Sequence, residues 1–183
     1  MYRIDHLAFR TLNKDKCVKF FCEALGYKKQ ADFTIYFDDE KKEVADCTAL
    51  EPGNKTNEAP WLTQVVIPGG NQEYVISPEI FISEGTPGSI VYEWAKKRGG
   101  AGLHHIALQV PDDSTVEIEM QKWLDNGWTT KFSTEKVISC DGLTQIFTSP
   151  NEVTGVIFEL IKREKHGFCK DSVKDLMEST RGD

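Results

Sequence analysis

Two histidines stand at matching places in two similar segments of this chain. One segment runs from Ile4 to Phe9 and contains His6, and the other runs from Leu103 to Leu108 and contains His105. Each segment alternates as a strand does, and each precedes a helix-like stretch that ends at a glycine. A duplicated strand that presents one imidazole in each copy predicts a metal ion held between two half-domains.

A carboxylate in the last apolar segment is the candidate for a third ligand. Because strand residues alternate between two faces, Glu159 shares a face with Ile157 and Ile161. A carboxylate is costly to bury without a partner, and a divalent cation shared with His6 and His105 would satisfy all three groups. Two histidines and one carboxylate leave coordination positions open for substrate, water or dioxygen.

The same alternation separates the two neighbouring histidines of the second segment. It places His105 on the face of Leu103 and Ala107, and it directs His104 to the opposite face. We therefore expect His105 to be the metal ligand and His104 to have a structural or supporting role.

Glu79 is a candidate for a fourth ligand or a catalytic base. Apolar residues follow it, as they follow Glu159, so an equivalent place for Glu79 would give one histidine and one glutamate from each half. The alternative is a solvated acid at a strand edge. Four protein ligands suit proton transfer at an enolate with a carboxylate as the base, whereas three suit oxygen activation.

The elements that must position these residues follow the order β-α-β-β-β twice. The expected strands are Tyr2–Thr11, Phe33–Phe37, Ala45–Leu50, Leu62–Ile67, Glu73–Ile82, Leu103–Val110, Lys131–Ile138, Leu143–Thr148 and Thr154–Arg163. The expected helices lie between Asn13 and Gly26, over Ser89–Lys97, between Val116 and Gly127, and over Ser172–Met177.

This order predicts an α+β fold, because helices do not flank every strand on both sides. Two such modules side by side would form one curved mixed sheet with a concave face. We expect a single domain over residues 1–163, with module one at 1–98 and module two at 99–163. Residues 164–183 form a C-terminal tail with a short helix.

The composition disfavours nucleic acid and membranes as partners, so we expect a small-molecule partner. The formal net charge of −7 argues against nucleic acid and anionic membranes. The sequence shows neither a signal peptide nor an apolar run long enough to span a bilayer. Five cysteines without a CxxC pair are expected to be reduced thiols of a cytoplasmic protein.

The segments that carry these candidate ligands resemble the vicinal oxygen chelate superfamily of glyoxalases, bleomycin resistance proteins and dioxygenases. Ile4–His6, Arg98–Leu108 and Phe158–Ile161 are similar to ligand-bearing segments of methylmalonyl-CoA epimerases and of the catalytic half of 4-hydroxyphenylpyruvate dioxygenases. The resemblance implies the vicinal oxygen chelate fold, a divalent metal on His6, His105 and Glu159, a small-molecule substrate and a homodimer.

Two further segments resemble the dioxygenase. Gln145–Pro150 is similar to a strand that places a glutamine and a phenylalanine near the substrate, and His166–Cys169 with the following helix is similar to a C-terminal helix that covers the site. This resemblance implies a non-haem Fe(II) dioxygenase acting on a small 2-oxo acid or related carboxylate. Gln145 would be catalytic, and Phe147 and Phe168 would line the substrate pocket.

Other features resemble the epimerase. The dioxygenase has an additional N-terminal domain without a counterpart in this sequence, and it has a glutamine where this chain has His104. The short stretch of sequence between His105 and Glu159 is more similar to the epimerase, and so is the segment Gly155–Glu159. They imply a glyoxalase-like or epimerase-like isomerase, in which Co, Mn, Zn or Ni would stabilise an enolate and Glu79 or Glu159 would move the proton. A non-catalytic protein that binds a small molecule is the third alternative.

Overall fold

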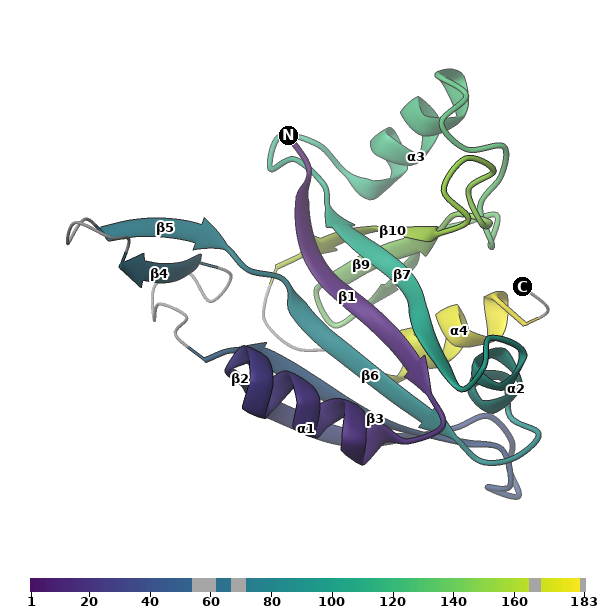
Figure 1. The fold of residues 1–183 in the computed structure, drawn as a ribbon. Helices are drawn as coiled ribbons and strands as arrows, with labels where there is room; N and C mark the ends of the chain where they lie inside the picture. Colours follow the sequence, from purple (N-terminus) through teal and green to yellow (C-terminus); the bar gives the residue numbers. More distant parts are fainter. Residues whose placement is uncertain (54–61, 67–71, 165–168, 182–183) are drawn as a thin grey trace.

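The strands of both halves join into one curved mixed sheet in this computed structural model (Figure 1). The structure describes residues 1–53, 62–66, 72–164 and 169–181. The strands are β1 Arg3–Thr11, β2 Tyr27–Tyr36, β3 Val44–Pro52, β4 Leu62–Val66, β5 Gln72–Ile76, β6 Glu79–Gly85, β7 Ala101–Gln109, β8 Ile138–Cys140, β9 Leu143–Phe147 and β10 Ile157–Arg163. The helices are α1 Lys14–Leu25, α2 Ile90–Lys97, α3 Val116–Asp125 and α4 Lys170–Ser179.

The two histidine-bearing strands are neighbours within the main sheet. Its strand order is β2-β3-β6-β1-β7-β10-β9-β8, and a separate ribbon consists of β4 and β5. β1 pairs antiparallel with β7, whereas β6 runs parallel beside β1 and β10 runs parallel beside β7. The halves therefore meet along β1 and β7, and the predicted α+β fold of two joined modules is confirmed.

Helices α1 and α3 cover the convex side of the sheet. Phe21 of α1 packs against Leu50 and Ile82, and Trp123 of α3 packs with Leu160. These strand residues alternate with the residues of the opposite side, so burial under the helices fixes which face each strand presents to the inside of the curve.

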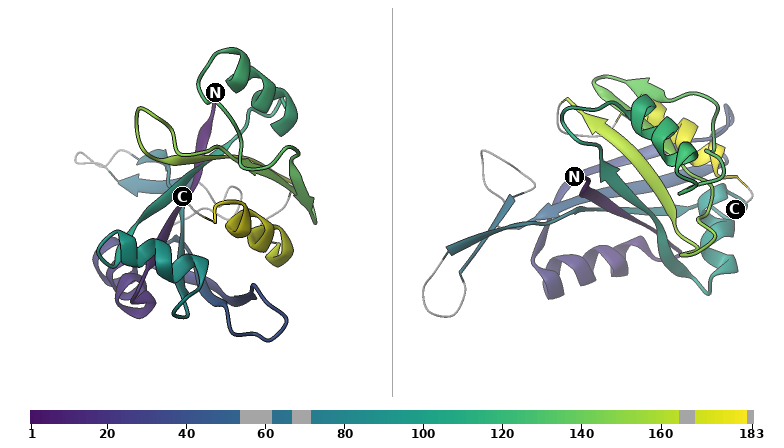
Figure 2. Two further views of the ribbon diagram at one scale, coloured as in Figure 1. Left: turned by 90° about the vertical axis from the view of Figure 1, so that its right-hand side faces the viewer. Right: turned by 90° about the horizontal axis from the view of Figure 1, so that it is seen from above.

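Helix α4 lies inside the curve of the sheet (Figure 2). Its residues Val173 and Met177 pack against Ala8 and Phe81 on the concave face. The expected C-terminal helix is thus present and extends beyond Ser172–Met177 at both ends. The helix that follows the strand of residues 157–163 in sequence therefore covers the face that carries the predicted ligands.

Local sequence signals set the ends of α1 as expected. The side chain of Asn13 accepts a hydrogen bond from the backbone N–H of Lys16 at 3.0 Å. Gly26 ends the helix in the left-handed conformation with φ 74°, which glycine adopts without steric cost. No helix in the described part of the chain is long and apolar enough to cross a membrane.

The single strand expected over Glu73–Ile82 is instead two strands that belong to different sheets. β5 pairs with β4, and β6 pairs with β1 and β3 in the main sheet. Pro78 lies between them and lacks the N–H that a continuous strand would need for its ladder.

The strand expected over Lys131–Ile138 was also wrong. Among the described residues this segment has one bridge, between Phe132 and Thr148, and the strand β8 begins only at Ile138. The hydroxyl of Thr134 donates to the carbonyl of Lys136 at 2.7 Å, and such a local side-chain bond favours a turn over a strand ladder.

Two of the five cysteines form a disulfide bond, contrary to the expectation of five reduced thiols. The bond joins Cys140 at the end of β8 to Cys169, which precedes α4. Cys17, Cys22 and Cys47 are free. Distant cysteines give no spacing signal, so only the folded chain brings this pair together. The expected cytoplasmic location rested partly on reduced thiols, and the disulfide removes that support.

Candidate metal centre

Strand register brings the three predicted metal ligands onto one face. Ala107 of β7 lies between His6 of β1 and Glu159 of β10. Ala8 of β1 lies opposite His105 of β7. The two alanines therefore stand between the three larger side chains. Because a methyl group fills little space, both imidazoles and the carboxylate have room to lean toward one another above the sheet.

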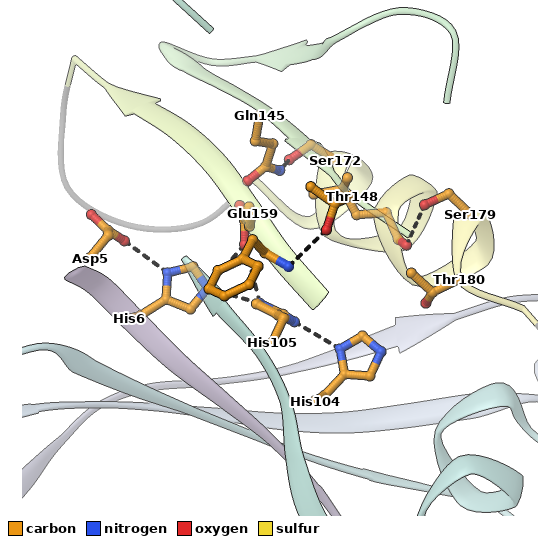
Figure 3. A network of polar contacts seen from close by, with 12 residues as sticks. Asp5, His6, His104, His105, Gln145, Thr148, Glu159, Ser172, Ser179 and Thr180 are labelled. Carbon is orange, nitrogen blue, oxygen red and sulfur yellow. Dashed lines mark hydrogen bonds and ion pairs between the residues drawn. The ribbon is translucent and has the colours of Figure 1, made fainter. Parts of the chain in front are cut away.

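The ligand atoms of this cluster form a nearly regular triangle (Figure 3). The Nε2 atoms of His6 and His105 are 3.2 Å apart. Oε2 of Glu159 is 3.3 Å from Nε2 of His6 and 3.2 Å from Nε2 of His105. Metal ions with such ligands hold them at about 2.0–2.2 Å, which places neighbouring ligand atoms about 3.0–3.5 Å apart. The triangle therefore fits one divalent ion.

The chemistry of the donor set fits a transition metal as well. All three side chains are buried, and Oε1 of Glu159 has no hydrogen-bond partner among the described residues. A buried carboxylate oxygen without a partner is costly, and a cation beside it relieves that cost. Two imidazole nitrogens and one carboxylate oxygen suit Fe(II), Mn, Co, Ni or Zn. Mg and Ca instead prefer sites in which all ligand atoms are oxygen.

A bulge precedes each ligand histidine. In β1, Asp5 is an extra residue between the pairs Ile4–Leu108 and His6–Ala107; in β7, His104 is an extra residue opposite the step from Ala8 to Phe9. A bulge interrupts the alternation of faces, so the extra residue can turn toward the side of its neighbour. The expectation that His104 points away from the site was therefore wrong.

Each bulge residue holds the ring of the ligand histidine beside it (Figure 3). Oδ1 of Asp5 accepts from Nδ1 of His6 at 2.8 Å. Nδ1 of His104 lies 2.8 Å from Nδ1 of His105. In both cases Nε2 is left to face the centre, as a metal ligand requires. The duplication thus extends to the supporting residues, with a carboxylate in one half and an imidazole in the other.

Arg163 at the end of β10 holds Asp5 in place. Its Nε lies 3.0 Å and 2.9 Å from the two carboxylate oxygens of Asp5, and its Nη2 lies 2.8 Å from Oδ1. Burial opposes the charge of Asp5, but the hydrogen bond from His6 and the Arg163 guanidinium hold the pKa of this carboxyl well below its usual range. Asp5 is therefore an ionised acceptor.

In the absence of a metal the two ligand histidines have pKa values shifted in opposite directions. Burial by itself would lower the pKa of His6, but the carboxylates of Glu159 and Asp5 raise it to about 9. Burial lowers the pKa of His105 to about 4. Burial also opposes ionisation of Glu159, but the charge of His6 and hydrogen bonds from both rings lower its pKa to about 2. In the metal-free cluster His6 is therefore the positively charged imidazole, and His105 is neutral.

The ligand atoms border a small cavity that α4 closes. Its volume is about 30 Å³, which holds one or two water molecules. Its apolar lining comes from Ala8, Phe9, Phe81, Phe147, Val173, Leu176 and Met177, and its polar lining from His6, Arg10, Ser83, His104, His105, Gln145 and Glu159. A substrate of more than a few atoms therefore needs α4 side chains to move aside.

Two of the three residues that the resemblance places near the substrate line the cavity. Gln145 and Phe147 line the cavity, and Nε2 of Gln145 donates to the hydroxyl of Ser172 on α4 (Figure 3). The ring of Phe147 packs on the ring of His105, with 4.6 Å between centroids. Phe168 lies outside the described residues.

Glu79 does not hold the place that matches Glu159. Glu79 lies opposite His6 in the register, whereas the pair that matches Ala107–Glu159 in the first half is Ala8–Phe81. The fourth ligand position suggested by the duplication is therefore a phenyl ring. Glu79 is absent from the described set of metal-ligating side chains and from the cavity lining, and its Oε1 accepts from Gln30 at 3.3 Å. Burial raises the pKa of Glu79.

The sequence interpretation gave no role to Asp5, Arg163 or Arg10, although all three lie at the site. In a strand without a bulge, the alternation of faces would direct Asp5 away from His6, so the sequence pattern gave it no role at the site. A signal was present, since a polar residue precedes the ligand histidine in both copies of the strand. Arg163 comes close only through the pairing of the two halves, so the sequence offers no local signal for it.

Comparisons with solved structures show the same fold in enzymes. A 4-hydroxymandelate synthase variant from Streptomyces coelicolor aligns with a TM-score of 0.70 and 18% identity, covering 98% of this chain and 53% of its own. Methylmalonyl-CoA epimerase from Streptomyces coelicolor aligns with a TM-score of 0.58 and 21% identity, covering 89% and 98%. The epimerase from Mycobacterium tuberculosis gives 0.56 and 15%, covering 88% of each chain. The chain spans about half the length of the synthase.

Sequence comparison identifies the family. No curated protein sequence matches the chain. The family model described as the glyoxalase/bleomycin resistance protein/dioxygenase superfamily matches residues 3–160, a segment that contains all three candidate ligands. The chain therefore belongs to the glyoxalase/bleomycin resistance protein/dioxygenase superfamily.

Proposed function

We propose that this protein is a metal-dependent enzyme that acts on a small 2-oxo acid or related carboxylate, as a non-haem Fe(II) dioxygenase of the 4-hydroxyphenylpyruvate dioxygenase type. The observation that carries the proposal is the buried triangle of His6, His105 and Glu159, with Phe81 at the fourth position that the duplication offers. Three protein ligands leave room for a chelating substrate and for dioxygen.

In this proposal the bound metal supplies Lewis-acid activation of the chelating substrate and, as iron, electron transfer to dioxygen. The protein's own groups prepare the site. Asp5 and His104 fix the ring orientations of the two histidines. Phe81 and Phe147 exclude water from the space beside them. The amide of Gln145 would exchange its partner Ser172 for a substrate oxygen when α4 moves.

An epimerase or isomerase is the second candidate, because methylmalonyl-CoA epimerases from Streptomyces coelicolor and Mycobacterium tuberculosis share the fold of this chain. An epimerase needs a base that reaches the substrate, and Glu79 would have to turn from Gln30 toward the cavity to serve as one. The position of Phe81 and the orientation of Glu79 therefore support the dioxygenase over the epimerase.

Metal analysis of the purified protein, combined with oxygen uptake on a panel of 2-oxo acids, tests the proposal. We expect about one Fe(II) per chain after anaerobic loading and uptake that depends on the 2-oxo acid. The variant His105→Ala should lose both metal and uptake, whereas Lys19→Ala on the exposed side of α1 should keep both. Unchanged metal content in His105→Ala would contradict the site.

The same assay separates the alternatives. Solvent deuterium that enters the α-carbon of a substrate without oxygen uptake would identify an isomerase. Failure of the intact protein to retain Fe, Mn, Co or Zn after refolding would favour a non-catalytic binding protein.

A further inference from the structure

A second functional group, Arg10, lines the cavity beside the candidate ligands and lies on the same strand as His6. Arg10 shares the concave face of β1 with His6 and Ala8, and only 2% of it is exposed. Its Nη2 donates to the hydroxyl of Thr180 at 3.2 Å, and its guanidinium lies 5.8 Å from the centre of the Trp94 ring. The proposed metal chemistry assigns no role to this buried cation.

Arg10 borders two cavities at once. It lines the metal-site cavity and also a neighbouring cavity of about 180 Å³ between α2 and the end of α4. Among the described residues this second cavity is also lined by Lys97, Glu93 and Arg181, and Arg181 is paired with Glu43 at 3.1 Å. Arg10 and Lys97 therefore outnumber Glu93 there, and this local excess of positive charge, in a chain of overall charge −7, would attract an anionic ligand.

His104 offers a second donor beside Arg10. Its ring packs against the same Trp94 ring that Arg10 approaches, with 5.2 Å between centroids, and 3% of the residue is exposed. If Nε2 of His105 binds a metal, Nδ1 of His105 carries the proton and donates to Nδ1 of His104, which leaves the N–H of His104 on Nε2. That Nε2 has no hydrogen-bond partner among the described residues, and His104 lines the cavity.

We propose that Arg10 and His104 form a carboxylate-binding subsite, so that the substrate carries a second carboxylate away from its metal-chelating end. A guanidinium matches a planar carboxylate with two parallel hydrogen bonds, and a buried N–H gains a partner when the ligand binds. Phe81, Phe147 and Leu176 supply apolar lining to the same cavity, and Ser83 and Gln145 are its other polar lining residues. The proposal rests on the proposed metal-dependent function and narrows its substrate class to 2-oxo dicarboxylic acids.

Titration calorimetry of Zn(II)-loaded protein with matched ligands tests the subsite without any turnover. The pairs are 2-oxoglutarate with 2-oxopentanoate, and 2-oxoadipate with 2-oxohexanoate. A hydrogen-bonded ion pair in a buried site predicts that at least one diacid binds roughly ten- to a hundredfold more tightly than its partner monoacid. The variant Arg10→Gln should abolish this preference and leave monoacid affinity and zinc content unchanged.

Three further variants separate the subsite from general effects. Arg10→Lys keeps the charge without the planar fork and should retain part of the preference. Thr180→Val removes the hydroxyl that Arg10 contacts and should retain the full preference. Lys97→Gln removes an exposed cation at the second cavity and should change affinity less than twofold. A loss in Lys97→Gln equal to that in Arg10→Gln would overturn the subsite, as would a preference that survives in Arg10→Gln.

The design also distinguishes this proposal from the proposed function. If the intact protein binds no metal, the proposed function fails, and glutarate is compared with pentanoate on the metal-free protein. Tighter binding of glutarate that depends on Arg10 would still support the subsite. If the protein binds zinc but every diacid binds no better than its monoacid, the subsite fails alone.

Discussion

At the scale of single residues, two bulges decide how the candidate site works. Each inserts one residue before a ligand histidine and thereby turns a supporting group, Asp5 or His104, toward the ring that it orients. The two supports differ in charge, because Asp5 is ionised and burial lowers the pKa of His104 well below its usual value. The positive charge of the metal-free cluster therefore resides on His6.

Metal affinity should therefore depend on pH in a defined direction. His6 must lose its proton to bind a metal, and its pKa is about 9 in the metal-free protein. Below pH 9 each unit of decreasing pH should lower the apparent affinity about tenfold, down to about pH 5, where His105 with its pKa of about 4 begins to compete as well. Competition with a chromogenic chelator for Zn(II) between pH 5.5 and 8 measures this slope.

The variant Asp5→Asn provides the matched test of that explanation. Loss of the Asp5 carboxylate removes one cause of the raised pKa of His6, so the slope should flatten at the alkaline end. The variant should also bind zinc about 10- to 100-fold more weakly at the upper end of the range, because the ring of His6 loses its orienting partner. Asp125→Asn on the exposed surface of α3 is the control. An unchanged profile in Asp5→Asn would contradict this role.

At the scale of elements, α4 covers the site and is linked to the main sheet at both of its ends. The disulfide Cys140–Cys169 fixes its beginning to β8, and the hydrogen bond from Arg10 to Thr180 fixes its end to β1. Between these points Val173, Leu176 and Met177 fill the cavity above the candidate ligands. Access to the site and the stability of this helix are therefore properties of the same few contacts.

Removal of the disulfide should loosen α4 more than the rest of the protein. Cys140 and Cys169 are 29 residues apart, and closing a loop of this size stabilises a folded chain by about 3–4 kcal/mol in the chain-entropy description. Cys169→Ser should lower the free energy of unfolding by up to that amount in urea. Hydrogen exchange should become faster first in the amides of α4.

The free cysteine Cys17, which is half-buried on α1, offers the matched substitution. Cys17→Ser should leave exchange in α4 unchanged. Protection of α4 that remains equal in Cys169→Ser and the wild-type protein would show that packing alone holds the helix.

At the scale of the whole molecule, the fold is an imperfect duplication. The halves share the histidine strand, the bulge and a nearby alanine, but the second half has Glu159 at the position where the first half has Phe81. This difference leaves three ligands in place of four. The asymmetry also confines Arg10 to one half, so charge is distributed unevenly around a nearly symmetric centre.

Restoring the missing ligand should change the properties of the site. In Phe81→Glu a fourth donor would stand beside the triangle, so zinc affinity should rise at least tenfold and the thermal midpoint should depend strongly on zinc. Without metal the variant should be destabilised, because the new carboxylate is buried. Phe81→Leu, which removes the ring and adds no donor, should show neither effect on zinc. Equal zinc affinity in Phe81→Glu and Phe81→Leu would show that residue 81 does not face the metal.

Much of this molecule follows from local sequence. Alternation of apolar residues, helix caps such as Asn13 and the glycine stop at Gly26 gave most elements and the α+β class. Matching places in two similar segments indicated His6 and His105, and the apolar residues around Glu159 indicated the third candidate ligand. Residue type and spacing were sufficient for these features.

Other features exist only in the folded chain. A bulge depends on the register between two strands, so His104 and Asp5 could not be placed from the alternation of one strand. Pairing across the halves brings Arg163 to Asp5 and Cys169 to Cys140. The sequence by itself thus determined which residues are able to bind a metal. Only the tertiary structure decided which groups orient, charge and cover them, because those contacts join residues whose sequence positions carry no information about one another.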